Sequence, residues 1–167
     1  MNADEVIATL GLTPHPEGGW YAETHRDPAP PGGGRGTVTA IYFLLRAGEC
    51  SRWHRVDATE IWLWHAGAPL RLGVSPEGRE VVHVPLGPDL ANGQRPQAVV
   101  PKDAWQAAES LGAWTLVSCV VAPAFEFAGF ELAAVGWEPV PTRRPLRRKR
   151  PRNTIPSGTS RPRSPRS

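Results

Sequence analysis

The sequence predicts one all-β domain, a sandwich or barrel, over residues 1–140. Nine short segments have β-type composition: 20–25, 37–45, 60–65, 70–74, 80–85, 97–100, 105–107, 114–121 and 130–134. Only residues 4–10 have the pattern of a helix, and the connections are rich in Gly, Pro and Asp. Short strands at close spacing with almost no helix are typical of sandwiches and barrels.

The elements follow in a simple order. In the helix at 4–10 the apolar residues share one side, Asn2 or Asp4 stands near its start, and Gly11 and Pro14 end it. The strands are separated by turn-forming stretches at 28–36, 75–78 and 87–93. The glycines at 32–36 lack the strand, helix and Lys-Ser/Thr of a phosphate loop, so we interpret them as a flexible hairpin connection.

Charge divides the chain into two parts. Residues 1–140 hold nine Lys and Arg against sixteen Asp and Glu, a net charge of −7, whereas residues 141–167 hold ten basic residues and no acidic one. The second part has almost no large apolar residue, which predicts a disordered basic tail. We expect a solvated extension, which by charge alone could contact nucleic acid or an acidic membrane surface only weakly. The acidic body gives no sign of a nucleic-acid surface.

The cellular location is predicted from the lack of a disulfide framework, a signal peptide and a membrane span in the sequence. Cys50 and Cys119 are too few for a disulfide framework. The N-terminus lacks the basic start and apolar run of a signal peptide, and no apolar stretch reaches the roughly 18 residues of a membrane span. We therefore expect a cytoplasmic protein with no membrane association.

One spaced motif carries most of the information in the chain. Gly48 is followed after five residues by His54, then by Glu60 and, after six more residues, by Gly67. This spacing resembles the first signature of the cupin superfamily, except that Val56 stands where a second histidine is usual. A second signature is matched in outline at 101–106, with Asp103 at the usual glycine and Gln106 at the usual histidine.

Further stretches resemble one subfamily, the cupin_5 group formerly called DUF985. They occur in order at 12–24, 40–45, 51–56, 60–67, 86–90, 96–101, 105–108 and 121–127. The resemblance implies an RmlC-like cupin double-stranded β-helix, a jelly-roll barrel, with the short N-terminal helix before it and the disordered tail after it. It also implies a homodimer. An epimerase-type activity has been suggested for the group from its likeness to sugar epimerases.

The predicted catalytic pair is His54 and Glu60. Alternate side chains of a strand share a face, so His54 and Val56 point the same way, and Glu60 shares a face with Trp62 and Trp64. A histidine beside a carboxylate can abstract a proton next to a carbonyl, because the carboxylate stabilises the imidazolium. The hypothesis is an epimerase or isomerase acting on a small, sugar-like carbonyl substrate.

The opposing acid and the substrate contacts come from other segments. Tyr21 or Tyr42 could supply the acid that an epimerisation needs, and Glu23, which shares a face with Tyr21, could reach the pocket mouth with Glu17. The predicted substrate-binding residues are Glu23, Trp53, Trp62, Trp64, Trp105 and Gln106. The indoles would form an apolar stacking wall.

Three alternatives remain open. A weak metalloenzyme would hold a divalent metal with His54, Glu60 and Gln106, but two of the usual three histidines are gone, so we expect no tight metal. A non-catalytic cupin would bind a metabolite without turnover. In a purely structural interpretation, His54 is a hydrogen-bonded core residue and the tryptophans pack the core. His65 and His83 are interpreted as structural.

Overall fold

The computed structural model describes residues 1–140; the basic segment 141–167, predicted to be disordered, lies outside the described residues. One helix, α1 (Ala3–Leu10), precedes the strands. The strands are β1 (Thr13–Pro14), β2 (Trp20–Arg26), β3 (Thr39–Arg46), β4 (Cys50–Val56), β5 (Thr59–Gly67), β6 (Leu70–Ser75), β7 (Val82–Leu86), β8 (Gln97–Val100), β9 (Trp105–Ser110), β10 (Trp114–Ala122) and β11 (Phe130–Leu132). Two 3₁₀ turns, η1 (Leu90–Asn92) and η2 (Phe127–Gly129), complete this part of the chain.

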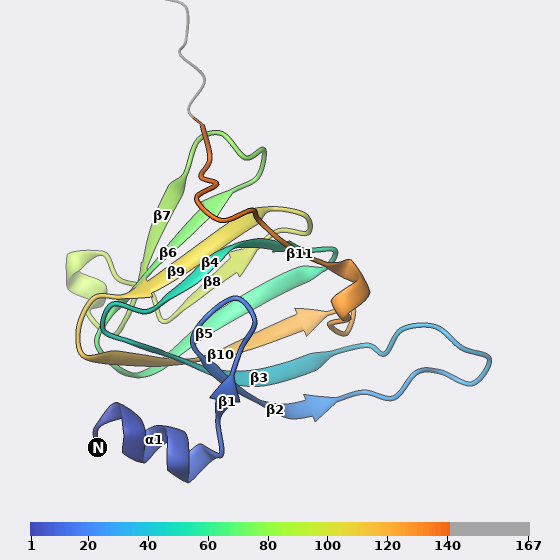
Figure 1. Ribbon diagram of the computed structural model, residues 1–167, viewed down its shortest axis with the longest axis horizontal. Coiled ribbons are helices and arrows are strands. Elements are labelled where there is room, and N and C mark those ends of the chain that lie inside the picture. The colour runs from blue at the N-terminus through green and yellow to red at the C-terminus, as the bar shows by residue number, and fades with distance from the viewer. Residues whose placement is uncertain (141–167) are drawn as a thin grey trace, which may run out of the picture.

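The strands form two antiparallel sheets that face each other (Figure 1). One sheet has six strands in the order β1-β2-β3-β10-β5-β8, and the other has five in the order β11-β4-β9-β6-β7. The predicted all-β architecture is confirmed. Sequence neighbours β4 and β5 lie in different sheets, so their inward side chains meet across the interior.

Local sequence explains the helix and its ends. The Asn2 side chain accepts a hydrogen bond from the Glu5 amide, and the Glu5 carboxylate accepts one from the Asn2 amide, which is a capping box. Gly11 ends the helix in the left-handed region, with φ at 63°. Val6 packs with Leu12 and Leu44, so the helix covers part of the six-stranded sheet.

The nine predicted strands are present with ends shifted by a few residues, and the structure adds β1 and β4. Strand β4 carries the motif histidine, yet it had no apolar alternation to reveal it. Its buried positions are Ser51, His54 and Val56, and a register shift between Ser51 and His54 interrupts the period of two. A strand whose inward residues are polar gives a weak hydrophobic signal.

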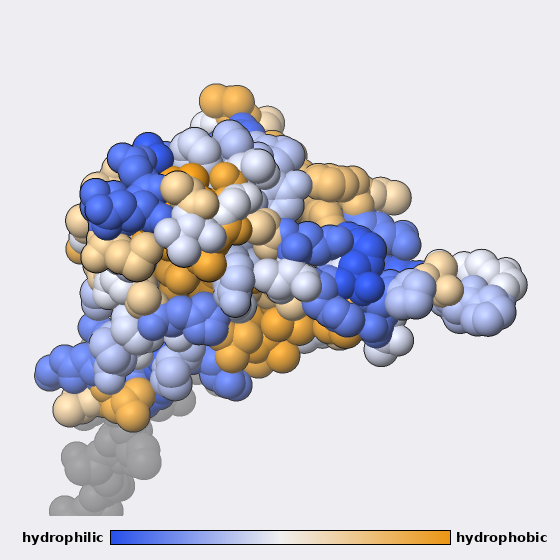
Figure 2. Space-filling model, turned by 90° about the horizontal axis from the view of Figure 1, so that it is seen from below, coloured by the Kyte–Doolittle hydropathy of each residue, from blue (hydrophilic) through white to orange (hydrophobic). Residues whose placement is uncertain are grey.

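The core between the sheets is dense at one end of the interior. Phe43, Leu45, Trp62, Leu72 and Val117 are almost fully buried in one cluster. On the outside, hydrophobic side chains lie exposed between hydrophilic ones on the lower face, and the β2–β3 connection projects from one end (Figure 2). No helix within residues 1–140 is long and apolar enough to span a membrane.

Candidate active site

A cavity of about 220 Å³ opens between the two sheets at the end of the interior that the apolar core leaves free. Its ionisable lining residues are His15, Glu17, Tyr21, Glu23, Arg26, His54, Glu60 and Cys119. The lining residues come from both sheets and from the loop before β2. The motif residues His54 and Glu60 are only 2% and 6% exposed, so both are inside, as the alternation predicted.

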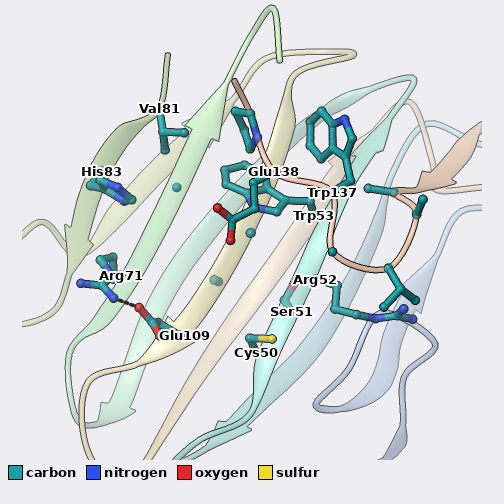
Figure 3. Close-up of a pocket in the computed structure, with 18 residues that line it drawn as sticks. Cys50, Ser51, Arg52, Trp53, Arg71, Val81, His83, Glu109, Trp137 and Glu138 are labelled. Atoms are coloured by element: carbon teal, nitrogen blue, oxygen red, sulfur yellow. Dashed lines mark hydrogen bonds and ion pairs between the residues drawn. The ribbon is translucent and has the colours of Figure 1, made fainter. Parts of the chain in front are cut away.

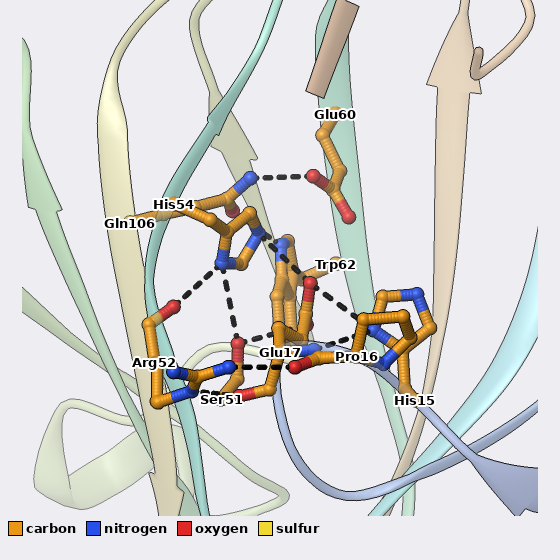
Figure 4. Close-up of polar contacts among 9 residues, drawn as sticks. All are labelled: His15, Pro16, Glu17, Ser51, Arg52, His54, Glu60, Trp62 and Gln106. Atoms are coloured by element: carbon orange, nitrogen blue, oxygen red, sulfur yellow. Dashed lines mark hydrogen bonds and ion pairs between the residues drawn. The ribbon is translucent and has the colours of Figure 1, made fainter. Parts of the chain in front are cut away.

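His54 is held in one tautomer by its neighbours. Its Nδ1 lies 2.8 Å from the carbonyl oxygen of Arg52, and a carbonyl only accepts, so Nδ1 carries the proton (Figure 4). Nε2 therefore bears the lone pair in the neutral ring. Burial lowers the pKa of His54, opposed by the nearby Glu60 carboxylate and by the hydrogen bond to Arg52. The imidazole is thus a neutral base with one nitrogen available.

Glu17 lies against that available nitrogen. Its Oε2 is 3.4 Å from His54 Nε2 and 3.4 Å from His15 Nδ1, while Oε1 accepts a 2.8 Å hydrogen bond from the Ser51 hydroxyl. His15 Nδ1 also accepts from the Glu17 amide, so it too is unprotonated in the neutral ring. A proton on that oxygen would face two nitrogen lone pairs and could hydrogen-bond to one of them.

The ionisation of Glu17 agrees with this geometry. Burial raises its pKa to about 7, against the opposing effects of His15, the Ser51 hydrogen bond and Arg52. A carboxyl group with a pKa near neutrality exchanges its proton easily at physiological pH. Glu17 and His54 therefore form a buried pair in which an acid and a base lie 3.4 Å apart.

The loop that carries Glu17 enters the barrel because two glycines permit it. At Gly18, where φ is 111°, an added Cβ would lie 2.2 Å from the Cys50 carbonyl oxygen; at Gly19, where φ is 73°, it would lie 2.7 Å from the Leu45 side chain. Arg52 pins the loop to β4 through its backbone amide, which donates to the Glu17 carbonyl, and its guanidinium, which donates to the Pro16 carbonyl. Glu17, expected to reach the pocket mouth, is instead buried in the lining of the cavity.

Glu60 is oriented by a chain of hydrogen bonds. Gln106 Nε2 donates to Glu60 Oε2 at 2.5 Å, and Gln106 Oε1 accepts from Trp62 Nε1 at 2.9 Å. Because an indole N–H can only donate, it fixes the amide with its nitrogen toward Glu60. Burial raises the pKa of Glu60, which His54 opposes. The thiol of Cys119 also hydrogen-bonds Glu60, and burial raises its pKa well above the usual value, so it stays protonated.

These hydrogen bonds test the expected metal set of His54, Glu60 and Gln106. The only oxygen of the Gln106 side chain is engaged by Trp62, and its amide nitrogen is no metal ligand. Within residues 1–140, no group of three or more His, Cys, Asp or Glu side chains is arranged to hold a metal ion. These donors therefore do not fit a divalent metal site.

Tyr21 lines the cavity, whereas Tyr42 does not. In the β2–β3 register Tyr21 pairs with Phe43, so these two share the inner face and Tyr42 takes the outer one. Tyr42 packs in the cluster beneath α1, near His65. Of the two predicted acids, only Tyr21 is in position.

The predicted indole wall is not part of the cavity. Trp62 and Trp64 belong to the apolar core, with Trp64 donating to the Ala68 carbonyl. Trp53 and Trp105 point away from the interior, because each is adjacent in its strand to an inward residue, His54 or Gln106. The aromatic wall of the cavity is instead formed by phenylalanines: Phe125, Phe127 and Phe130.

Trp53 lines a second, larger cavity, the outer groove. This groove of about 640 Å³ lies on the outward face of the five-stranded sheet and is bordered by residues 133–139 (Figure 3). Trp137 packs edge-on against Trp53 and is tilted onto Trp105. Arg71 and Glu109 form an ion pair across its floor. His83 is on its rim.

Comparison with known proteins agrees with this architecture. The chain is 43% identical to a protein of known crystal structure from Shewanella oneidensis, with a TM-score of 0.75 over 80% of this chain and 85% of the other. It is 31% identical to a hypothetical protein from Leishmania major, with a TM-score of 0.73 over 80% and 88%. Oxalate decarboxylase from Bacillus subtilis, at 11% identity and a TM-score of 0.53, covers 71% of this chain and shares the fold alone. A search of curated proteins gave no match.

Two facing antiparallel sheets with a polar pocket between them define a cupin, a double-stranded β-helix. The model of the family described as "Cupin superfamily (DUF985)" matches residues 4–133. The chain belongs to this family, Cupin_5, and the resemblance stated from the sequence is confirmed.

Proposed function

We propose that this protein is a metal-independent epimerase or isomerase that enolises a small, sugar-like carbonyl compound. The observation that carries the proposal is the buried pair of His54 and Glu17, in which one nitrogen lone pair lies 3.4 Å from a carboxyl oxygen whose pKa is near 7. A base and an acid that are both functional near neutral pH are what enolisation requires.

The proposed step begins with His54 Nε2 taking the proton from the carbon next to the carbonyl. The electron pair of that C–H bond forms a carbon–carbon double bond, and the carbonyl oxygen takes the proton from Glu17 Oε2. The product is an enol, with His54 as imidazolium and Glu17 as carboxylate. The new charges face each other inside the pocket, and Glu60 adds a second acidic neighbour to His54.

Reprotonation decides between the two reaction types. If the Tyr21 hydroxyl, which comes from the opposite sheet, protonates the other face of the carbon, the configuration inverts and the enol oxygen returns its proton to Glu17. Tyr21 is then a phenolate and His54 an imidazolium, and transfer of the His54 proton to Tyr21 through solvent restores the starting state. If the substrate carries a hydroxyl on the deprotonated carbon, the His54 imidazolium can instead protonate the former carbonyl carbon while that hydroxyl gives its proton to Glu17; the carbonyl moves, the product is an isomer, and both residues regain their starting states. The enol is common to both outcomes.

The size and lining of the cavity support a small substrate. A volume of about 220 Å³ corresponds to roughly seven water molecules at liquid density. Phenylalanine faces can stack on the apolar side of a sugar ring. In this proposal the phenylalanines take the place of the expected tryptophan wall.

The homodimer that the family resemblance implies remains a separate prediction.

The test is solvent deuterium incorporation. The protein is incubated in D₂O with a panel of aldoses, ketoses and their acid and phosphate derivatives, and deuterium at carbon is detected by NMR. We expect incorporation into one class of substrate and a loss of 100-fold or more in His54→Gln, in keeping with the usual contribution of a general base of about 10²–10⁴.

The matched control is His83→Gln, which removes a histidine of the outer groove and should leave the rate unchanged. Equal incorporation by wild type and His54→Gln would overturn the proposed mechanism. Saturable binding of a panel member without exchange would instead establish the non-catalytic metabolite-binding alternative.

A further inference from the structure

The mouth of the active-site cavity contains one permanent cation. Among the described residues that line the cavity, Arg26 is the only lysine or arginine, whereas Glu17, Glu23 and Glu60 are acidic. A single guanidinium in an otherwise acidic lining is a specific feature of the site, and the enolisation step does not use it.

Arg26 is held in a fixed orientation by two partners. Its Nε lies 3.0 Å and 3.2 Å from the two carboxylate oxygens of Glu23, and a terminal nitrogen lies 2.6 Å from one of them. The other terminal nitrogen donates to the Phe125 carbonyl at 2.9 Å. The guanidinium therefore bridges β2 and the segment before η2, across the cavity mouth.

The Phe125 anchor is itself fixed. The amide of Phe125 donates to Thr39 Oγ1 at 2.9 Å, and the neighbouring Ala124 amide donates to the Gly36 carbonyl at 3.0 Å. Arg35 also donates to the Ala124 carbonyl and pairs with Asp57 at 2.8 Å. The Phe125 carbonyl thus orients Arg26 whether or not Glu23 is engaged.

The Glu23 partner, in contrast, is exchangeable. The side chains of Arg26 and Glu23 are 43% and 39% exposed, and a solvent-exposed ion pair contributes only about 0–1 kcal/mol. A carboxylate or phosphate from a ligand can offer the same two-oxygen geometry to the guanidinium. Glu23 occupies the place that such a group would take.

We propose that Arg26 binds an anionic oxygen group of the substrate, a carboxylate or a phosphate, and that Glu23 is the group it displaces. The inference rests on the proposed function, because it names the substrate class of the same site: a small carbonyl compound with an anionic end. The anion lies at the mouth, and Phe125 and Phe127 face the part of the ligand that enters the cavity. Displacement of Glu23 makes this carboxylate a selectivity element, since a neutral ligand cannot replace it.

The experiment measures binding of inorganic phosphate and of acetate, by NMR, at two local signals: the Arg26 Nε–H and the Phe125 amide. Local signals are required because the ten basic residues at 141–167 would dominate any bulk measurement of anion binding to the full chain. The variants are Arg26→Gln, Arg26→Lys and Glu23→Gln. The control is Glu131→Gln, which removes the carboxylate of a similarly exposed ion pair, Arg55–Glu131, outside the cavity.

Both signals should shift and saturate in wild type, and Glu23→Gln should tighten binding roughly three- to tenfold, as expected for removing a competing exposed carboxylate. Arg26→Gln should abolish the Phe125 shift, Arg26→Lys should weaken binding by losing the two-pronged contact, and Glu131→Gln should change nothing. The tighter of phosphate and acetate identifies the anionic group.

An unchanged Phe125 response in Arg26→Gln, or unchanged affinity in Glu23→Gln, would overturn this inference. Its failure is distinguishable from failure of the proposed function, because anion binding depends on Arg26 and deuterium exchange depends on His54. Deuterium incorporation into neutral sugars alone, without NMR shifts on addition of phosphate or acetate, would support the enolisation and rule out an anionic substrate.

Discussion

The inner pocket and the outer groove lie on opposite faces of β4 and differ in what burial does to their charges. Facing inward, His54 is 2% exposed and adjoins carboxyl groups that are themselves buried. Facing outward, Trp53 lines the outer groove together with Arg71 and Glu109, whose side chains are 52% and 41% exposed. The outer groove has almost three times the volume, but Glu17, His54 and Glu60, the buried groups whose pKa values are shifted, line the inner pocket.

The difference teaches that burial, rather than size, distinguishes the candidate active site from the outer groove. Burial raises the pKa of a carboxyl group toward neutral pH and lowers that of an imidazole, which keeps the imidazole an unprotonated base at neutral pH. In the outer groove, Arg71 and Glu109 are exposed to solvent and paired with each other. The contrast can be measured, and three substitutions sharpen it in decreasing order of effect.

The largest expected effect comes from Glu17→Gln on stability. An unfolded glutamate titrates near 4.5 and the folded group near 7, so the folded state holds an extra proton between these values. Burial of Glu17 therefore lowers the free energy of unfolding of the wild type as the pH rises. This loss is absent below pH 4.5, grows up to pH 7 and is constant above pH 7. We expect the free-energy difference between Glu17→Gln and wild type to change by about 3 kcal/mol in favour of the variant from pH 4.5 to pH 8.

Urea unfolding at a series of pH values measures this difference. The glutamine can still accept from Ser51 and donate to an imidazole, so packing is preserved. Glu131→Gln, at an exposed position outside the pocket, is the control and should show little pH dependence. A difference between Glu17→Gln and wild type that does not vary with pH would mean that burial does not shift Glu17.

The second effect is expected in the outer groove, from Trp137→Ala. Trp137 is half-buried and contacts two other indoles, so its loss should cost about 2 kcal/mol, less than the 3–5 kcal/mol for a fully buried tryptophan. Deuterium incorporation per folded molecule should stay at the wild-type level. A fall in that rate at full folding would show that the groove takes part in catalysis.

The smallest effect is expected at Asp103, which lies in the turn between β8 and β9 and lines neither cavity. Its φ of 63° is in the left-handed region, where a side chain is unfavourable, and its amide donates to the Val56 carbonyl. Asp103→Gly should stabilise the protein by about 0.5 kcal/mol, since relief of strain is partly offset by the entropy of glycine. Asp103→Ala, measured by the same urea unfolding, should not stabilise the protein, because alanine keeps the side chain at this φ. A higher free energy of unfolding in Asp103→Ala would contradict the strain at this position.

Much of the inner pocket could be predicted from the sequence by strand alternation and motif spacing. His54, Glu60 and Gln106 lie inside, and Tyr21 and Glu23 line the same cavity. The same alternation could have excluded Trp53 and Trp105, since each is adjacent to an inward residue. To exclude Tyr42 from the cavity, one must know the register in which β2 pairs with β3, and the sequence alone does not give this register.

The central role of Glu17 could not be predicted, because it depends on a loop folding back into the barrel. Glu17 contacts Ser51 and His54, which are more than thirty residues away in the sequence. The local sequence His-Pro-Glu-Gly-Gly does not determine where the Glu17 side chain points. The consecutive glycines after the acid are the one local signal in the sequence, since they allow the close backbone packing that brings this loop into the barrel.

The central claim is that Glu17 keeps a proton near neutral pH through burial against two imidazoles. Carbon-13 NMR of the glutamate side-chain carboxyls, with the Glu17 signal assigned by its loss in Glu17→Gln, measures this directly. We predict a titration midpoint near 7 for Glu17. A midpoint near 4.5, the ordinary value, would contradict the protonation of Glu17 near neutral pH and the enolisation that is built on it.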